Sequence, residues 1–81
     1  MSINEYNPSL GKLIDIEEKE IYNMNHVNGA INIPYEILLY NKDRLLNKSE
    51  TYYIYCKSGH KSKRLTNILN AYGFKVVQVL L

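Results

Sequence analysis

YYIYCKSGHKS, residues 52–62, joins a strand pattern, a cysteine and a polar loop. Residues 52–55 are apolar and prone to β-structure, and Cys56 follows them as the only cysteine of the chain. Lys57–Ser62 is short and polar, and a helical pattern runs from Lys63 to Tyr72. Loop N–H groups and the positive end of a helix dipole favour a thiolate at such a junction. The stretch therefore predicts a strand–loop–helix unit with a nucleophilic cysteine that carries or transfers a charged group.

Four short apolar runs predict strands, and none of them alternates cleanly between apolar and polar residues. This pattern is typical of strands that are buried on both faces of a parallel sheet. The predicted strands are Lys12–Ile16, Ala30–Ile33, Tyr52–Tyr55 and Lys75–Leu80. The segments between them favour helices at Glu17–Asn23, Tyr35–Leu46 and Lys63–Tyr72, with Gly73 as a C-terminal cap that lets Phe74 pack back. Alternating strands and helices predict an α/β fold with a mainly parallel sheet of about four strands.

Charge is distributed unevenly along the chain. Residues 1–50 carry five basic and eight acidic side chains, whereas residues 51–81 carry five basic side chains and no acid. Four of the five, namely Lys57, Lys61, Lys63 and Arg64, lie within eight residues of Cys56. Such a field attracts an anionic substrate and stabilises a thiolate. The alternatives are a solvated basic helix face or a nucleic-acid contact, and the absence of interleaved exposed aromatics argues against nucleic acid.

Length and composition exclude several classes. Eighty-one residues predict one domain, residues 1–81, and no apolar run is long enough for a membrane span. The first residues lack the basic and apolar parts of a signal peptide, and a single cysteine fits a reducing cytoplasm, so we expect a cytoplasmic protein without membrane contact. One cysteine and two histidines do not make a tetrahedral metal set, so no metal or other cofactor is expected.

Taken together, three motifs resemble those of the single-domain rhodaneses, a family of sulfurtransferases. The motifs are Leu13–Ile16 (LIDI), His26–Pro34 (HVNGAINIP) and Tyr53–Ser62 (YIYCKSGHKS), and the tail Gly73–Val77 (GFKVV) also matches. The resemblance implies a rhodanese-like fold and a thiosulfate sulfurtransferase activity. In that reaction Cys56 attacks a small anionic sulfur donor, becomes a persulfide and passes the sulfur to cyanide, a thiol or a protein acceptor.

The resemblance also implies roles for the residues around Cys56. Cys56 is the catalytic residue, and the substrate-binding residues are Lys57, Ser58, Gly59, His60, Lys61 and Ser62. Backbone N–H groups of the loop would hold the persulfide, and Gly59 allows the loop to curl. Lys61 would hold the donor's sulfonate as a point charge. Ser62 would cap the helix or donate to the sulfur. His26 is expected to be structural, and Asp15 is expected to brace a neighbouring loop.

Departures from the family pattern leave a second reading open. Glu17 stands where the family usually has arginine, which predicts weaker anion binding or an altered structural ion pair. Relatives usually continue past the position of Leu81 into a further helix, so we expect this C-terminal helix to be missing and part of a sheet face to be bare or covered by a partner. The alternative is therefore a catalytically weak or inactive rhodanese-like module that binds a partner. A cysteine phosphatase or arsenate reductase is disfavoured because Arg64 lies too far along the helix to close an anion loop. The sequence does not indicate an oligomeric state.

Overall fold

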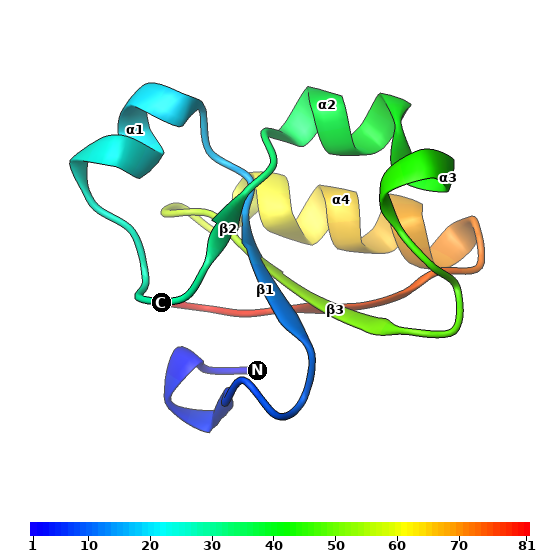
Figure 1. The fold of residues 1–81 in the computed structure, drawn as a ribbon, viewed down its shortest axis with the longest axis horizontal. Helices are drawn as coiled ribbons and strands as arrows, with labels where there is room; N and C mark the ends of the chain where they lie inside the picture. The colour runs from blue at the N-terminus through cyan, green and yellow to red at the C-terminus, as the bar shows by residue number, and fades with distance from the viewer.

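Four parallel strands form one sheet in the computed structural model, which describes all 81 residues (Figure 1). The strands are β1 (Lys12–Asp15), β2 (Ile31–Asn32), β3 (Thr51–Tyr55) and β4 (Lys75–Gln78). Their order is β2-β1-β3-β4, and every pairing is parallel. The predicted α/β class with a parallel sheet of four strands flanked by helices is confirmed.

Four α-helices and one 3-10 helix, η1 (Ile3–Glu5), accompany the sheet. The α-helices are α1 (Lys19–Met24), α2 (Tyr35–Tyr40), α3 (Lys42–Leu45) and α4 (His60–Ala71). The single helix predicted over residues 35–46 is wrong, because Asn41 ends α2 and begins α3. Its side-chain amide donates to the carbonyl of Ile37, and such local side-chain bonds compete with a continuous helix. None of these helices has the length and apolar content that a membrane crossing requires.

Helix α4 begins three residues earlier than the sequence pattern predicts. Gly59 precedes it with a positive φ of 82°, and the hydroxyl of Ser58 accepts the N–H of His60 at 3.2 Å. Half of the predicted loop therefore forms the first helical turn. At the other end, Gly73 has a φ of 94° and Phe74 is buried, which confirms the predicted cap.

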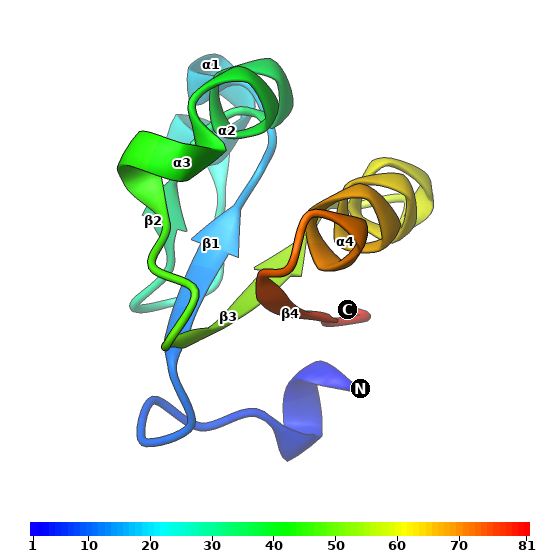
Figure 2. The ribbon, with the colours of Figure 1, turned by 90° about the vertical axis from the view of Figure 1, so that its right-hand side faces the viewer.

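The two faces of the sheet are covered by different parts of the chain (Figure 2). On one face, strand residues such as Ile14 and Ile54 pack with Leu38 and Leu65 of the helices. On the other face, a smaller cluster formed by Leu13, Ala30, Tyr53, Tyr55 and Val79 is covered by Ile3, Tyr6 and Val27.

The N-terminus extends the sheet beyond β4. Ser2 forms a parallel bridge with Leu80, and the N–H of Ile3 donates to the carbonyl of Leu80 at 2.8 Å. No helix follows β4, yet Tyr53 and Val79 on that face are buried. Ile3 and Tyr6 of the N-terminal segment therefore cover the centre of this face, while Leu80 and Leu81 after β4 are exposed. Local sequence patterns do not signal such pairing between chain ends.

Candidate functional site

The sheet topology places a switch point at the carboxyl ends of β1 and β3. These central strands are neighbours, with Asp15 opposite Tyr55. The chain leaves β1 through α1 toward β2 on one side, and leaves β3 through α4 toward β4 on the other. Ligands of open parallel sheets bind outside such a switch point, where neighbouring strands connect in opposite directions. Cys56 follows β3 there, directly beside the segment that follows β1.

The sulfur of Cys56 is held by Ser62. The backbone N–H of Ser62 donates to the sulfur at 3.3 Å, and the thiol reaches the Ser62 hydroxyl at 3.4 Å. The Ser58 hydroxyl lies 4.0 Å away. Ser62 itself is fully buried in the first turn of α4, so it is no helix cap. This geometry provides the sulfur with one N–H donor and one hydroxyl.

The remaining loop residues occupy different positions around the sulfur. Gly59 adopts a left-handed conformation, which fits the expectation that a glycine lets the loop curl. The side chains of Lys57, His60 and Lys61 are exposed. Lys57 and His60 form hydrogen bonds through their backbone N–H groups only. These three side chains therefore face solvent, and none of them forms a hydrogen bond to the sulfur.

The N–H groups of the loop are divided between protein partners and solvent. The N–H of Lys57 donates to the Glu17 carboxylate at 2.9 Å, so it is not free for a ligand. The N–H groups of Ser58, Gly59 and Lys61 have no acceptor in the protein. Half of the six N–H groups of Lys57–Ser62 therefore remain without a protein partner beside Cys56.

The buried carboxylate of Asp15, at the end of β1, joins three neighbouring segments of the chain. Asp15 accepts the N–H of Glu17 and the hydroxyl of Tyr55, each at 2.8 Å. The N–H of Val27 donates to the same hydroxyl at 2.9 Å. Burial raises the pKa of Tyr55 far above its ordinary value, and the bond to Asp15 adds to the rise while the bond from Val27 opposes it. Asp15 thus ties the loop of Val27 to the central strands, which fits its expected bracing role.

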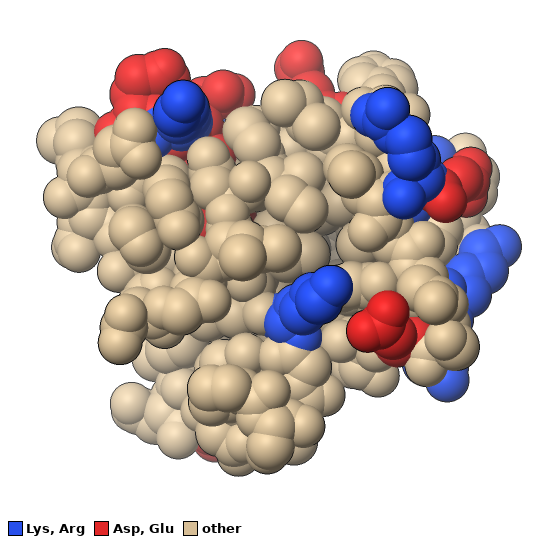
Figure 3. Space-filling view, in the orientation of Figure 1, with Lys and Arg blue, Asp and Glu red and all other residues tan.

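The first turn of α4 carries positive charge at the positive end of its dipole. It contains no acid, and Lys61 and Lys63 lie on it. Cations at this end disfavour the helix but favour an anion bound near it. Acidic side chains gather elsewhere, over α1, where Glu18 and Glu20 are exposed (Figure 3). The basic half of the sequence thus contributes the cations of the first α4 turn, and the acidic half contributes the exposed carboxylates at α1.

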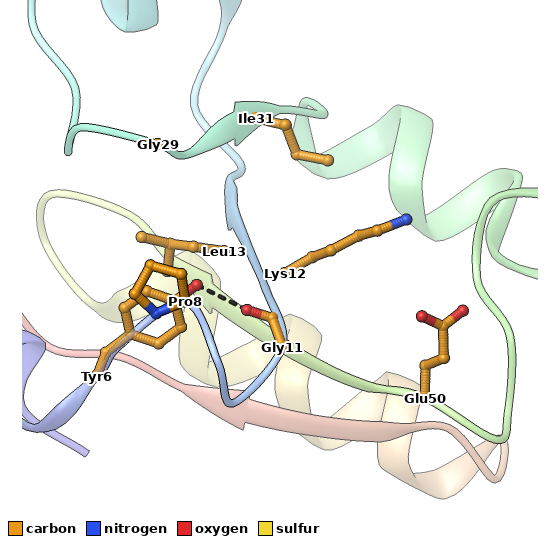
Figure 4. A pocket seen from close by; sticks show the side chains of 8 residues that line it. All are labelled: Tyr6, Pro8, Gly11, Lys12, Leu13, Gly29, Ile31 and Glu50. Atoms are coloured by element: carbon orange, nitrogen blue, oxygen red, sulfur yellow. Dashed lines mark hydrogen bonds between the residues drawn. The ribbon is translucent and has the colours of Figure 1, made fainter.

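Two hollows open on the surface. One of about 450 Å³ lies beside the Cys56 loop and is lined by Ser58, Gly59, His60, Lys63, Gln78 and Leu80. The other, of about 320 Å³, lies near the start of β1, where the Tyr6 hydroxyl donates to the carbonyl of Gly11 (Figure 4). Burial, and secondarily Tyr53, raises the pKa of Tyr6. Only the first hollow is lined by residues of the loop that follows Cys56.

The other residues that sequence reasoning considered lie outside the site. His26 stacks on the ring of Tyr22 with centroids 3.7 Å apart, and its Nδ1 lies 2.8 Å from the Tyr22 carbonyl, which fits a structural role. No three histidine, cysteine or acidic side chains gather as metal ligands do.

The comparisons with known proteins agree with this geometry. The model of the rhodanese-like domain family matches residues 2–81. The chain belongs to the rhodanese-like domain family. Thiosulfate sulfurtransferase PspE of Escherichia coli (strain K12) is 35% identical to this rhodanese-like domain over 69 residues. That match covers 80% of this chain and 64% of the relative, so the chain spans less than two thirds of its length.

Solved structures show the same fold. A Staphylococcus saprophyticus protein is 31% identical with a TM-score of 0.79, and the match covers 96% of this rhodanese-like domain and 75% of that chain. A rhodanese-like domain protein from Staphylococcus aureus is 29% identical with a TM-score of 0.77, covering 94% and 72% of the two chains. The reduced CoADR-RHD of Bacillus anthracis is 26% identical with a TM-score of 0.83. The match covers 98% of this chain and 14% of the Bacillus anthracis chain.

One residue of this rhodanese-like domain was not recognised from its sequence. Gln78 of β4 donates from its side-chain amide to the carbonyl of Gly59 at 2.8 Å and to the hydroxyl of Ser62 at 2.9 Å. A signal for it exists, since Gln78 is a polar residue inside the apolar run Val76–Leu80. Such a residue on a parallel strand needs a polar partner.

Proposed function

We propose that this rhodanese-like domain is a sulfurtransferase that works through a persulfide on Cys56. The Cys56 thiolate attacks the outer sulfur of thiosulfate, the bond between the two thiosulfate sulfurs breaks, and sulfite leaves with its electron pair. An acceptor thiolate then attacks the outer persulfide sulfur and regenerates the Cys56 thiolate. Charge balances in both steps, and no metal or organic cofactor is needed. A reducing cytoplasm would keep the thiol available.

The observation that carries this proposal is the setting of the Cys56 sulfur. It follows a central strand at the switch point of the sheet, with the Ser62 N–H at 3.3 Å. The N–H groups of Ser58, Gly59 and Lys61, on the loop that follows Cys56, have no acceptor in the protein and are available to an added, charged sulfur. Preorganised donors of this kind stabilise charge without reorganising during the reaction. Family membership and the likeness to a thiosulfate sulfurtransferase support the same chemistry.

We propose that Lys61 assists donor binding. Its ammonium group is exposed on the first turn of α4, next to the loop, and is free to meet the sulfonate of thiosulfate. His60 and Lys63 line the neighbouring hollow and add to the same positive surface. A cation that binds donor and transition state equally lowers KM without changing kcat.

A catalytically weak partner-binding module is the second candidate. Two observations favour it. Cys56 is only 2% exposed, and the buried Glu17 carboxylate occupies the first N–H of the loop. A negative charge at that position opposes the approach of a dianion. Turnover measurements distinguish a weak transferase from an inactive module.

Steady-state turnover of thiosulfate with cyanide as acceptor tests the proposal. Cys56→Ser should remove turnover, and Lys61→Ala should raise the donor KM roughly three- to tenfold at unchanged kcat. Lys75→Ala is the matched control, since Lys75 begins β4 away from the loop. Turnover retained by Cys56→Ser would exclude the mechanism. An unchanged KM in Lys61→Ala would remove the lysine from the binding site.

A further inference from the structure

The carbonyl of Gly59 has more donors than it can hold. It accepts from the amide of Gln78 at 2.8 Å, from the N–H of Lys63 at 3.1 Å and from the hydroxyl of Ser62 at 3.2 Å. A carbonyl oxygen has two lone pairs, so three donors compete for two places. The Ser62 hydroxyl is the most distant of the three, and it is the donor most easily displaced.

The Ser62 hydroxyl has a second acceptor when Cys56 is charged. In the neutral state the thiol donates to the Ser62 oxygen at 3.4 Å, and the Ser62 proton points to Gly59. A thiolate or persulfide anion has no proton to donate and only accepts. The Ser62 proton then turns to the sulfur, where a charged hydrogen bond is stronger than the bond to a carbonyl.

The amide of Gln78 makes this turn possible. One of its hydrogens keeps the Gly59 carbonyl occupied after the Ser62 proton leaves. The other donates to the Ser62 oxygen at 2.9 Å and so polarises the hydroxyl that donates to the sulfur. The orientation of the amide is unambiguous, because a carbonyl can face only the nitrogen.

We propose that Gln78 is a positioning residue for sulfur transfer, which directs the Ser62 hydroxyl onto the charged sulfur of Cys56. This inference rests on the proposed function for its turnover prediction. Without the amide, Ser62 becomes the second donor to the Gly59 carbonyl, and its proton is held away from the sulfur. Gln78 makes no hydrogen bond to the sulfur, and in this proposal it acts on the sulfur through Ser62.

Gln78→Met tests this role, since methionine keeps the length of the side chain and removes both donors. Loss of one hydrogen bond to a charged group should lower kcat roughly tenfold, with the donor KM within about twofold of the original protein. Ser62→Ala should lower kcat by a similar factor. The double variant should be no slower than Ser62→Ala, because Gln78 has nothing to position once the hydroxyl is gone.

Asn70→Leu is the matched control. The Asn70 amide also joins α4 to β4 by two hydrogen bonds, to the carbonyl and N–H of Val76, each at 2.9 Å. Its loss should destabilise the fold and leave kcat unchanged. A normal kcat in Gln78→Met, additive losses in the double variant, or an equal loss in Asn70→Leu would overturn the role of Gln78. Gln78→Leu is the second variant if Gln78→Met does not fold.

Alkylation separates this inference from the proposed function. Iodoacetamide consumes the Cys56 thiolate without a sulfur donor, so its rate at neutral pH reports the same hydrogen bonds. Absence of thiosulfate turnover in the unmodified protein would refute the proposed function alone. Slower alkylation in Gln78→Met than in Asn70→Leu would still support the positioning role. Equal alkylation rates in the two variants would refute it.

Discussion

The segments that follow β1 and β3 lie side by side, but they differ in how their polar groups are used. After β1, both oxygens of the Asp15 carboxylate have donors, and Glu17 accepts from Lys57. After β3, the N–H groups of Ser58, Gly59 and Lys61 have no acceptor in the protein. Buried polar groups are normally paired, so the first segment is a brace. The second segment leaves three of its donors without a protein partner.

The largest effect should come from breaking the brace. Asp15→Ala leaves the Tyr55 hydroxyl and the Glu17 N–H without their acceptor in a buried place. We expect the free energy of unfolding to fall by about 2–4 kcal/mol in urea titrations. The exposed Asp43→Ala should change it by no more than about 0.5 kcal/mol. Equal losses in the two variants would mean that Asp15 is no brace.

Alkaline pH should weaken the hydrogen bond between Tyr55 and Asp15 and so destabilise the fold. The pKa of Tyr55 is raised in the folded protein, so folding favours the protonated hydroxyl. Its contribution is complete below the unfolded pKa, about 10, and is lost as the pH rises toward the folded value. Tyr55→Phe should be less stable at pH 7 by about 1–3 kcal/mol and lose less stability above pH 10. Parallel pH curves for the two proteins would contradict this assignment.

Two glycines with positive φ allow the cost of backbone strain to be distinguished from an effect on the Cys56 loop. Gly29 and Gly59 have φ values of 86° and 82°, and alanine at either should cost about 1 kcal/mol. The added carbon meets nothing within 4 Å at Gly29, and at Gly59 it makes only ordinary contacts, 3.5 Å from Leu80 Cδ2 and 3.7 Å from the Gln78 amide nitrogen. The strain at Gly59 is that of its backbone, and it falls where the Gly59 carbonyl accepts from Gln78 and Ser62. Gly59→Ala alone should slow sulfur transfer. Equally slow transfer in Gly29→Ala would show that the effect does not depend on the Cys56 loop.

The smallest effect should come from the charge that links the two segments. Glu17→Gln keeps an oxygen for the Lys57 N–H and removes a buried negative charge. The thiosulfate KM should fall roughly two- to fivefold, because less repulsion opposes a dianion. The exposed Glu18→Gln should leave KM unchanged. A higher KM in Glu17→Gln would show that the carboxylate holds the loop in its binding shape.

The sequence was informative where the signal is local. The four strands, the Gly73 cap and the junction at Cys56 follow from apolar runs and turn residues. The break at Asn41 was missed because periodicity continues across it. The hydrogen bonds from the Lys57 N–H to Glu17 and from the Gln78 amide to Ser62 join residues 40 and 16 positions apart, and no local pattern encodes such contacts. The covering of one sheet face by the N-terminus was missed for the same reason.

The central claim, that Cys56 carries transferable sulfur, is tested most directly by the intact mass of the protein. Mass spectra would be recorded after incubation with thiosulfate, again after cyanide, and in parallel for Cys56→Ser. We expect a gain of one sulfur atom that disappears with cyanide and never forms in Cys56→Ser. A folded protein with an alkylatable Cys56 that gains no sulfur from thiosulfate or a persulfide donor would contradict the account and favour the partner-binding module.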